Sequence, residues 1–308
     1  MFKLRNKVKR LMAVTLTAFI FSMVSISAVH ADEPSGPASD TQIAVHNDDA
    51  ATGPGAQSQE TQPGAEQVQP PVEQPQVPTE QPQPPAEQLG TDSDASGKIM
   101  SGGRLIDPSA PMIALTFDDG PYAPVGNKIM DCLEQHNGRS TFFVVGNRVH
   151  SYKSEIKRMH DGGHEVANHT YEHKYLTGLS AAGIRSQIEK CNEVVAAVTG
   201  EAPTLVRLPG GLKNATVLAN VHYPMIMWNI DTMDWKTKNA QKSIHAVLGK
   251  VQDGDIILMH ELYTPSGEAA AAIIPALTEQ GYQLVTVSEM AKFRGGVAAG
   301  KLYNKFRP

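Results

Sequence analysis

The sequence predicts an α/β fold, a distorted (β/α) barrel of about seven parallel strands that a disordered linker precedes. From residue 98 onward, short apolar runs alternate with longer stretches in which apolar residues recur at helical spacing. This alternation favours parallel strands with right-handed crossovers, in a barrel or in a doubly wound sheet, and periodicity alone does not distinguish the two. Residues 32–97, by contrast, lack the apolar groups that a core needs.

The predicted strands are short runs of large apolar residues, many of them β-branched. We expect strands at residues 112–117, 140–146, 164–168, 204–208, 225–230, 255–260 and 282–287. The stretches between them have helical spacing, and several end in Gly or Asn, as helix C-termini do. We expect helices at residues 127–137, 153–163, 181–200, 214–221, 241–251 and 267–280.

The N-terminal third predicts export and a spacer. Residues 1–31 have a basic start, an apolar run and small residues at the cleavage offsets, which indicates a signal peptide or, if uncleaved, an N-terminal anchor. Residues 32–97 are rich in Pro, Gln and Glu and predict a disordered, semi-rigid linker. We therefore expect residues 98–308, the predicted catalytic domain, to be secreted or attached to the cell surface or cell wall.

Charge and cysteine content exclude some classes of partner. The net charge of −5 gives no basic footprint, so we expect no nucleic-acid partner, and membrane contact only through an uncleaved N-terminal segment. Cys132 and Cys191 lack the spacing of a zinc or redox motif, and the sequence leaves open whether they form a disulfide. It does not determine the oligomeric state.

Ionisable side chains gather where the predicted strands end. They are Asp118, Asp119, His169, His173, Arg207, Asp231, Asp234 and His260. Because the carboxyl ends of parallel strands and the loops after them form the active face of such folds, this clustering predicts an active site.

Three of these residues are candidate metal ligands. Asp119, His169 and His173 combine one carboxylate with two imidazoles, a set suited to Zn²⁺ or a similar divalent ion. The spacing of the two histidines would place both rings on one side of a helical turn. We expect one divalent cation, Zn²⁺ in preference to Co²⁺, Mn²⁺ or Ni²⁺. Beside such a cation Asp118 would remain ionised and serve as a general base.

Five motifs follow one another along the chain: TFDDGP (116–121), NHTYEH (168–173), RLPGG (207–211), WNIDTMDW (228–235) and ILMH (257–260). In this order they resemble the motifs of the NodB-homology polysaccharide deacetylases, carbohydrate esterase family four. The resemblance spans about residues 105–308. It implies that Asp118 is the catalytic base, which Arg207 pairs with and orients. It also implies that His260 is the general acid, which Asp234 holds and tunes.

The resemblance also implies a substrate site. The backbone N–H of Gly210 would join the metal in stabilising an oxyanion, and Trp228, Trp235 and Leu258 would wall the pocket for the acetyl methyl group. Gly210 departs from the family, since many relatives carry Tyr there, and this would widen the groove or alter substrate contacts. We rank Asp231 below Asp234 as a site residue, because Asp231 could instead cap a loop.

These residues predict hydrolysis of N-acetyl groups on a cell-surface amino-sugar polymer. An exported enzyme on a spacer favours peptidoglycan, at N-acetylglucosamine or N-acetylmuramic acid. The alternatives are deacetylation of chitin oligosaccharides, hydrolysis of O-acetyl esters on xylan, or a catalytically silent glycan-binding module. A zinc peptidase is disfavoured because the HExxH motif is missing from the sequence.

Overall fold

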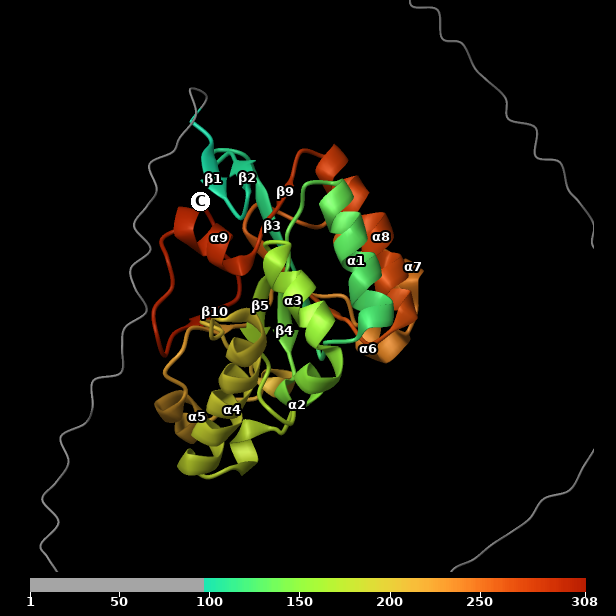
Figure 1. Cartoon of the computed structure of the whole chain (residues 1–308). Helices are drawn as coiled ribbons and strands as arrows, with labels where there is room; N and C mark the ends of the chain where they lie inside the picture. Colours follow the sequence, from blue (N-terminus) through green and yellow to red (C-terminus); the bar gives the residue numbers. More distant parts are fainter. Residues whose placement is uncertain (1–96) are drawn as a thin grey trace, which may run out of the picture. The chain divides into compact units, whose positions relative to one another are not determined.

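The computed structural model describes residues 97–308 (Figure 1). The predicted signal peptide or anchor at residues 1–31 and the predicted linker, apart from Gly97, lie outside the described residues. Within residues 97–308, none of the helices has both the length and the apolar character needed to cross a bilayer.

A parallel sheet forms the centre of the domain. Its strands run in the order β5 (Glu165–Asn168), β4 (Thr141–Val144), β3 (Met112–Asp118), β8 (Asp255–His260) and β7 (Ile230–Asp231). The short strand β9 (Gln283–Leu284) pairs in parallel with the first residues of β3. Strand β3 is buried along its whole length, which explains why it reads as a continuous apolar run.

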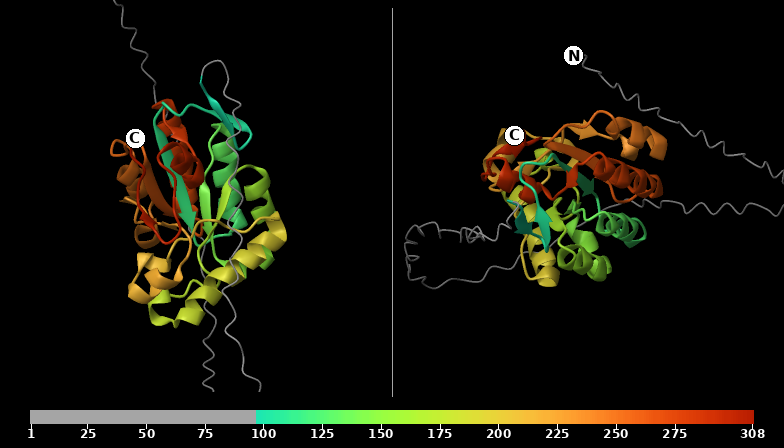
Figure 2. Two further views of the ribbon diagram at one scale, coloured as in Figure 1. Left: turned by 90° about the vertical axis from the view of Figure 1, so that its left-hand side faces the viewer. Right: turned by 90° about the horizontal axis from the view of Figure 1, so that it is seen from above.

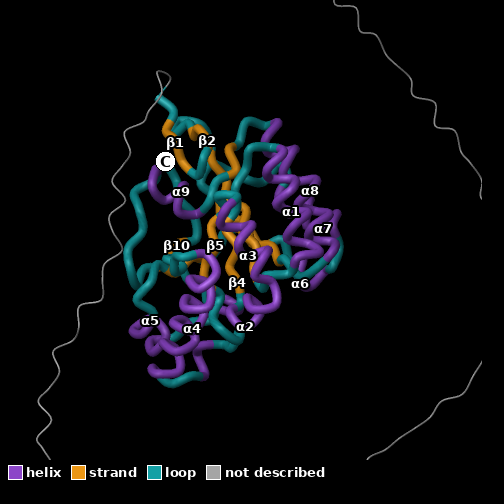
Figure 3. The backbone as a smooth tube through the Cα atoms, in the orientation of Figure 1, coloured by secondary structure: helices purple, strands orange, loops and turns teal. Residues whose placement is uncertain are grey.

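The sheet continues past β5 and curves into a distorted barrel. Val206 forms parallel bridges both to Asn168 at the end of β5 and to Met225 in β6 (Met225–Ile226). Strand β6 then pairs in parallel with β10 (Leu302–Tyr303). Figure 3 shows the strands grouped along the middle of the domain with helices on their outer side. The predicted class, an α/β barrel of parallel strands, is confirmed.

Alternate residues of the strands belong to different cores. Ile113, Leu115 and Phe117 of β3 pack in the larger cluster, which includes side chains of the outer helices α1 (Ala123–Gln135) and α8 (Thr264–Glu279). The neighbours of these residues on β3 point to the other face. Met112 and Ala114 join Phe143, Ala167, Ile226 and Ile256, contributed by four further strands, in a second cluster. This inward cluster is the interior of the barrel, and it supports the site at the strand ends.

The helices surround the strands (Figure 2). Besides α1 and α8 they are α2 (Gly146–Val149), α3 (Lys153–Asp161), α4 (Ala181–Thr199), α5 (Ala215–Asn220), α6 (Asp234–Thr237), α7 (Ala240–Val247) and α9 (Val287–Phe293), with single 3₁₀ turns at His150–Tyr152, Leu176–Gly178 and Pro209–Gly211. Each of the six predicted helices has a counterpart. Helices α1, α7 and α8 pack together on one flank (Figure 1).

Three predicted strands differ from the structure. The run at 204–208 contributes only the bridges of Val206, and the run at 225–230 divides into β6 and β7. The run at 282–287 holds only β9, because Thr286 caps helix α9 in a reciprocal capping box with Glu289. The strand therefore ends early, although the residues that follow it are β-branched, because the cap at Thr286 begins helix α9.

A hairpin and a C-terminal strand were not predicted. Strands β1 (Ile99–Ser101) and β2 (Arg104–Ile106) pair antiparallel, and a buried ion pair of 2.7 Å joins Arg104 to Glu289 of α9. This pair fastens the hairpin to the C-terminal part of the chain.

Cys132 and Cys191 are both free thiols, and burial raises the pKa of Cys191 to about 12.

Candidate active site

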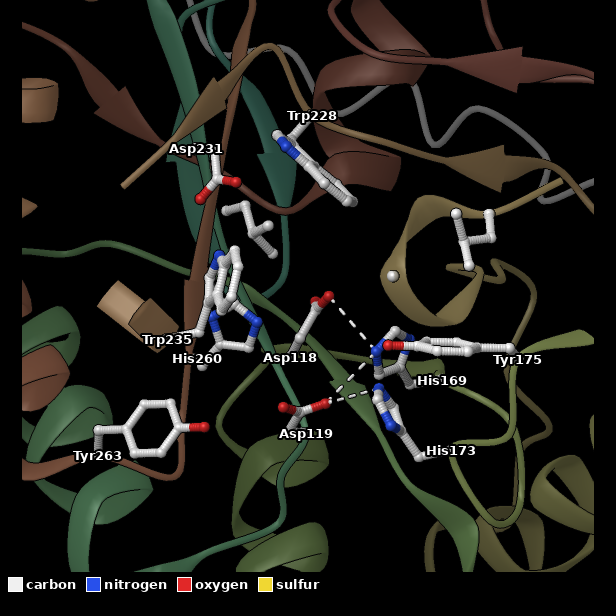
Figure 4. Close-up of a pocket in the computed structure, with 13 residues that line it drawn as sticks. Asp118, Asp119, His169, His173, Tyr175, Trp228, Asp231, Trp235, His260 and Tyr263 are labelled. Atoms are coloured by element: carbon white, nitrogen blue, oxygen red, sulfur yellow. Dashed lines mark ion pairs between the residues drawn. The ribbon is translucent and has the colours of Figure 1, made fainter. Parts of the chain in front are cut away.

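A cavity of about 420 Å³ opens at the carboxyl ends of the strands (Figure 4). It is lined by Asp118, Asp119, His169, His173, Tyr175, Gly210, Leu212, Trp228, Asp231, Trp235, Leu258, His260 and Tyr263. Nine of the eleven predicted site residues are therefore in its wall. The other two, Arg207 and Asp234, lie directly behind Asp118 and His260 and bind them.

Strand register places the predicted base beside the predicted acid. Asp118 ends β3 and pairs in register with His260 at the end of the neighbouring strand β8. Asp118 also continues the inward face of β3, two residues after Thr116 and four after Ala114. The next residue, Asp119, has φ of +70°, which turns the chain out of the strand and directs a second carboxylate to the cavity.

Arg207 is fully buried and binds Asp118. Its Nη1 donates to Asp118 Oδ1 and to Thr116 Oγ1, both at 2.7 Å. Its Nε and Nη2 donate to the carbonyl oxygens of residues 226 and 227, and its guanidinium lies 4.0 Å from the ring centre of Phe143. Since Oδ1 is held by this network, Oδ2 of Asp118 is the oxygen left to face the cavity.

The three predicted metal ligands converge. One donor atom from each of Asp119, His169 and His173 lies within 4.8 Å of the other two. Asp119 Oδ1 is 3.2 Å from His173 Nε2 and 3.5 Å from His169 Nε2, and it is buried with no hydrogen-bond partner among the described residues. A buried carboxylate oxygen without a donor, facing two imidazole nitrogens, fits a divalent cation.

The local geometry of the two histidines differs from the prediction. They lie on an irregular loop after β5, not on a helical turn, and the ring centroids are 4.9 Å apart. Thr170 and His173 have φ of +68° and +55°, a region that non-glycine residues rarely adopt. Together with Asp119, these residues concentrate backbone strain at the cluster, as functional sites often do.

The surroundings fix the tautomer of His169. Its Nδ1 lies 2.8 Å from the backbone carbonyl of Arg207, which only accepts, so Nδ1 carries a proton and Nε2 is left for the cluster. Burial lowers the pKa of His169, but the carboxylates of Asp118 and Asp119 raise it by a larger amount, so the net shift is upward. Burial raises the pKa of Asp119, yet the two imidazoles lower it to about 2. The carboxylate is thus ionised whenever a cation would bind.

His260 and Asp234 form a second linked pair. Asp234 Oδ1 accepts from His260 Nδ1 at 2.7 Å, and its Oδ2 accepts from the His260 backbone N–H and from Ser266 Oγ. Nε2 of His260 is thereby left toward the cavity. Burial lowers the pKa of His260, but the hydrogen bond to Asp234 and the charges of nearby carboxylates outweigh it and raise the pKa.

The remaining wall is apolar and partly exposed. Trp228 is half-buried, Leu258 is buried and Trp235 is 43% exposed. Gly210 has φ of +63°, and a Cβ there would lie 3.0 Å from Tyr175 Cε1, so the Tyr175 ring fills the space over this glycine. The absence of a side chain at position 210 therefore does not widen the cavity at that point.

Sequence reasoning did not single out Tyr175, Leu212 or Tyr263. Tyr175 and Leu212 are 59% and 45% exposed and sit in loops at the rim of the cavity. The sequence signal that could have identified Tyr175 is its position two residues after His173, a predicted metal ligand. Asp231, which the sequence ranked lower, lines the cavity and caps its own loop by accepting from the Met233 N–H.

The chain is similar to known polysaccharide deacetylases. A family model described as polysaccharide deacetylase matches residues 106–226. The chain is 40% identical over 189 residues to the peptidoglycan-N-acetylmuramic acid deacetylase PdaC of Bacillus subtilis (strain 168), covering 61% of this chain and 40% of that protein. It is 38% identical over 178 residues to the peptidoglycan-N-acetylglucosamine deacetylase PgdA of Listeria monocytogenes (serotype 1/2a, strain 10403S), covering 58% and 38%. The match thus spans about two fifths of these relatives.

A solved structure is similar over nearly its whole length. The family 4 acetyl xylan esterase from Clostridium thermocellum, in complex with a cobalt ion, is 33% identical, with a TM-score of 0.60 over 63% of this chain and 98% of that one. The fold, the match of the family model and this similarity agree. The chain belongs to the polysaccharide deacetylase family.

Proposed function

We propose that this protein hydrolyses N-acetyl groups of amino sugars in peptidoglycan, and that it does so outside the cytoplasm. The observation that carries the proposal is the cavity in which Asp118, backed by Arg207, faces an Asp–His–His cluster and lies beside His260. The peptidoglycan substrates in the names of PdaC and PgdA support the choice of polymer. The export-type start of the sequence supports the location.

We propose that Asp119, His169 and His173 hold one divalent cation. Zn²⁺ suits this donor set best, with Co²⁺, Mn²⁺ and Ni²⁺ as alternatives. When bound, such an ion would supply Lewis acidity toward an acyl oxygen and would lower the pKa of a water molecule.

The side chains of the protein would move the protons. Asp118, with Oδ1 held by Arg207, would accept a proton from the attacking water at Oδ2. The backbone N–H of Gly210 would donate to the oxygen on which charge develops. His260, kept protonated by Asp234, would then give its Nε2 proton to the departing amine. Base and acid end adjacent strands, and they would thus act on one amide bond.

The apolar wall would bind the acetylated sugar. Leu258, Trp228 and Trp235 would enclose the acetyl methyl group, which has no hydrogen bonds to offer. Tyr175 and Leu212 would contact the sugar ring at the rim, since exposed apolar side chains around a cavity are typical of ligand contact.

Removal of the metal is expected to abolish activity reversibly. Chelation should reduce release of free amines from acetylated glycan to background, and Zn²⁺ or Co²⁺ should restore it. A cation at about 100 times its Kd also stabilises the fold by about 2.7 kcal/mol, so Tm should fall on chelation. Asp119→Asn should lack both the metal-dependent Tm shift and activity. Full turnover after complete removal of the metal would contradict the proposal.

Tyr175→Ala is expected to weaken substrate binding more than turnover. Loss of an aromatic contact of about 0.5–1.5 kcal/mol corresponds to a rise in KM of roughly two- to tenfold, with kcat little changed. Tyr175→Phe, which keeps the ring over Gly210, should remain close to wild type. Steady-state kinetics on a glycan oligosaccharide check this, and equal effects of both substitutions would assign the contribution to the hydroxyl instead.

A second candidate function is hydrolysis of O-acetyl esters, since the similar esterase from Clostridium thermocellum is named for acetyl xylan. A substrate panel of peptidoglycan, chitin oligosaccharides and acetyl xylan would rank the polymers. Mass spectrometry of wall fragments would identify which sugar loses its acetyl group. Exclusive acetate release from xylan would replace the peptidoglycan proposal.

A further inference from the structure

Two buried carboxyl groups lie outside the machinery described above. Glu155 in the first turn of α3 is 3% exposed, and Glu261, the residue that follows His260, is fully buried. A Cβ built on Gly126 of α1 would overlap carboxyl oxygens of both, so the two side chains converge at this glycine. A Cβ on Gly120 would likewise overlap Glu261. Glycine at both positions makes room for the pair.

The pair is short of hydrogen-bond donors. Glu261 Oε1 accepts from the Tyr122 N–H at 2.8 Å. Among residues 97–308, no donor reaches the other three oxygens, which are Oε2 of Glu261 and both oxygens of Glu155. Two buried, adjacent carboxylates with a single donor between them would repel strongly, so one of them must carry a proton or a cation must lie between them.

The charges around the pair disfavour a further cation, and burial favours a proton. Besides Glu261, the main charged groups that act on Glu155 are the guanidinium groups of Arg148 and Arg158, which lower its pKa but by less than burial raises it; Arg148 also lowers the pKa of Glu261. Two cationic side chains and only two carboxylates make a poor site for a further metal ion. Burial and the neighbouring Glu261 raise the pKa of Glu155 to about 9, and burial also raises the pKa of Glu261.

Glu261 connects the two ends of the Asp118–Tyr122 segment to strand β8. Its backbone N–H donates to the carbonyl of Asp118 at 2.9 Å, and its carboxyl group accepts from the N–H of Tyr122. Asp118 and Asp119 lie within this segment, and His260 immediately precedes Glu261. A shift of Glu261 would therefore move base and acid relative to each other.

We propose that Glu155 and Glu261 share a single proton and act as positioning residues that hold the Asp118–Tyr122 segment against His260. The shared proton serves as the missing donor between the two carboxyl groups, so the pair is neither fully charged nor unpaired. The catalytic consequence rests on the proposed function, whereas the shared proton does not.

Infrared difference spectra of the full-length, metal-loaded protein test the proton directly. At neutral pH the wild type should show the C=O band of a protonated carboxyl group that is missing from Glu155→Gln and from Glu261→Gln, because either amide replaces the shared proton. Glu268→Gln, at an exposed position on α8, should leave the band unchanged. If no such band distinguishes the wild type, or if Glu155→Gln removes a second bound metal ion measured by mass spectrometry, the shared proton is wrong.

Kinetics and metal binding test the positioning role. In Glu261→Gln the amide can accept from Tyr122 N–H and donate to Glu155, so this conservative variant should rescue function. Glu261→Leu loses both contacts and should lower kcat and metal affinity by about 10- to 100-fold, with KM less affected. If Glu261→Leu fails to fold, Glu155→Leu, which keeps the Tyr122 contact, should show a smaller loss that Glu155→Gln reverses. Equal losses in the Gln and Leu variants would overturn the positioning role, while an inactive wild type with the infrared band intact would count against the proposed function alone.

Discussion

Asp118→Asn should lower kcat for amine release by about 10²- to 10⁴-fold, the usual contribution of a general base. Asparagine has nearly the same shape, and its amide oxygen can still accept from Arg207 Nη1, so the network behind the cavity should persist. The amide cannot take a proton from water at the position of Oδ2. Because Asp119, His169 and His173 are unchanged, the variant should still bind metal and glycan.

Asp231→Asn is the matched control for this change. Asp231 lines the same cavity, and its Oδ1 accepts from the Met233 N–H at 2.8 Å, a bond that an amide oxygen can also make. The control removes the same charge from the same cavity, so its rate should stay near that of the wild type. Equal losses in both variants would indicate a general electrostatic effect. A wild type that binds glycan without turnover would instead favour a silent binding module.

Much of the fold was predictable because its signals are local. Strand β3 is buried throughout and therefore appears as an unbroken apolar run, whereas helix α4 shows helical spacing and is capped after Thr199 by Gly200, with φ of +87°. The parts that failed depend on distant partners. Val206 is held in the sheet by bridges to Asn168 and Met225, and the β1–β2 hairpin is fastened through Arg104 to Glu289. The sequence of neither segment indicates which distant residues it pairs with.

The sequence predicted which side chains gather at the candidate site, but not the buried contacts that hold them in place. Strand ends made Asp118 and His260 recognisable, since register places them side by side. Arg207 could have been a surface ion-pair residue on sequence grounds, and only the structure reveals its burial against Phe143. Glu155 had no visible role, because the need for a buried proton arises only when α3 packs beside the residue that follows β8.

Asp234→Asn should lower kcat by about 10²- to 10⁴-fold, because it removes the group that keeps His260 a proton donor. Both oxygens of Asp234 accept from donors, Oδ1 from His260 Nδ1 and the Trp235 N–H, Oδ2 from the His260 N–H and Ser266 Oγ. An amide supplies only one accepting oxygen. In either orientation its NH₂ group faces a backbone N–H, at a cost of about 1–3 kcal/mol of stability.

The pH dependence separates loss of the acid from loss of stability. A general acid works only when protonated, so the wild-type rate should fall as pH rises through the raised pKa of His260. Without the Asp234 charge that pKa falls, and the alkaline limb of the kcat profile in Asp234→Asn should move to lower pH. The ion pair's contribution to stability follows the same sign, since it is present below the unfolded pKa of histidine and lost as pH rises through the folded value.

Ser266→Ala provides the comparison for Asp234→Asn, because it deletes one buried hydrogen bond to Asp234 and leaves the carboxylate charge in place. Its thermal unfolding should show a loss of stability of the order of 1 kcal/mol, while the alkaline limb stays near the wild-type position. The two variants thus share a weakened Asp234 network but differ in the charge beside His260. If both move the limb equally, or if Asp234→Asn leaves it in place, then His260 does not act as an acid under the control of Asp234, and the amine must receive its proton from another group.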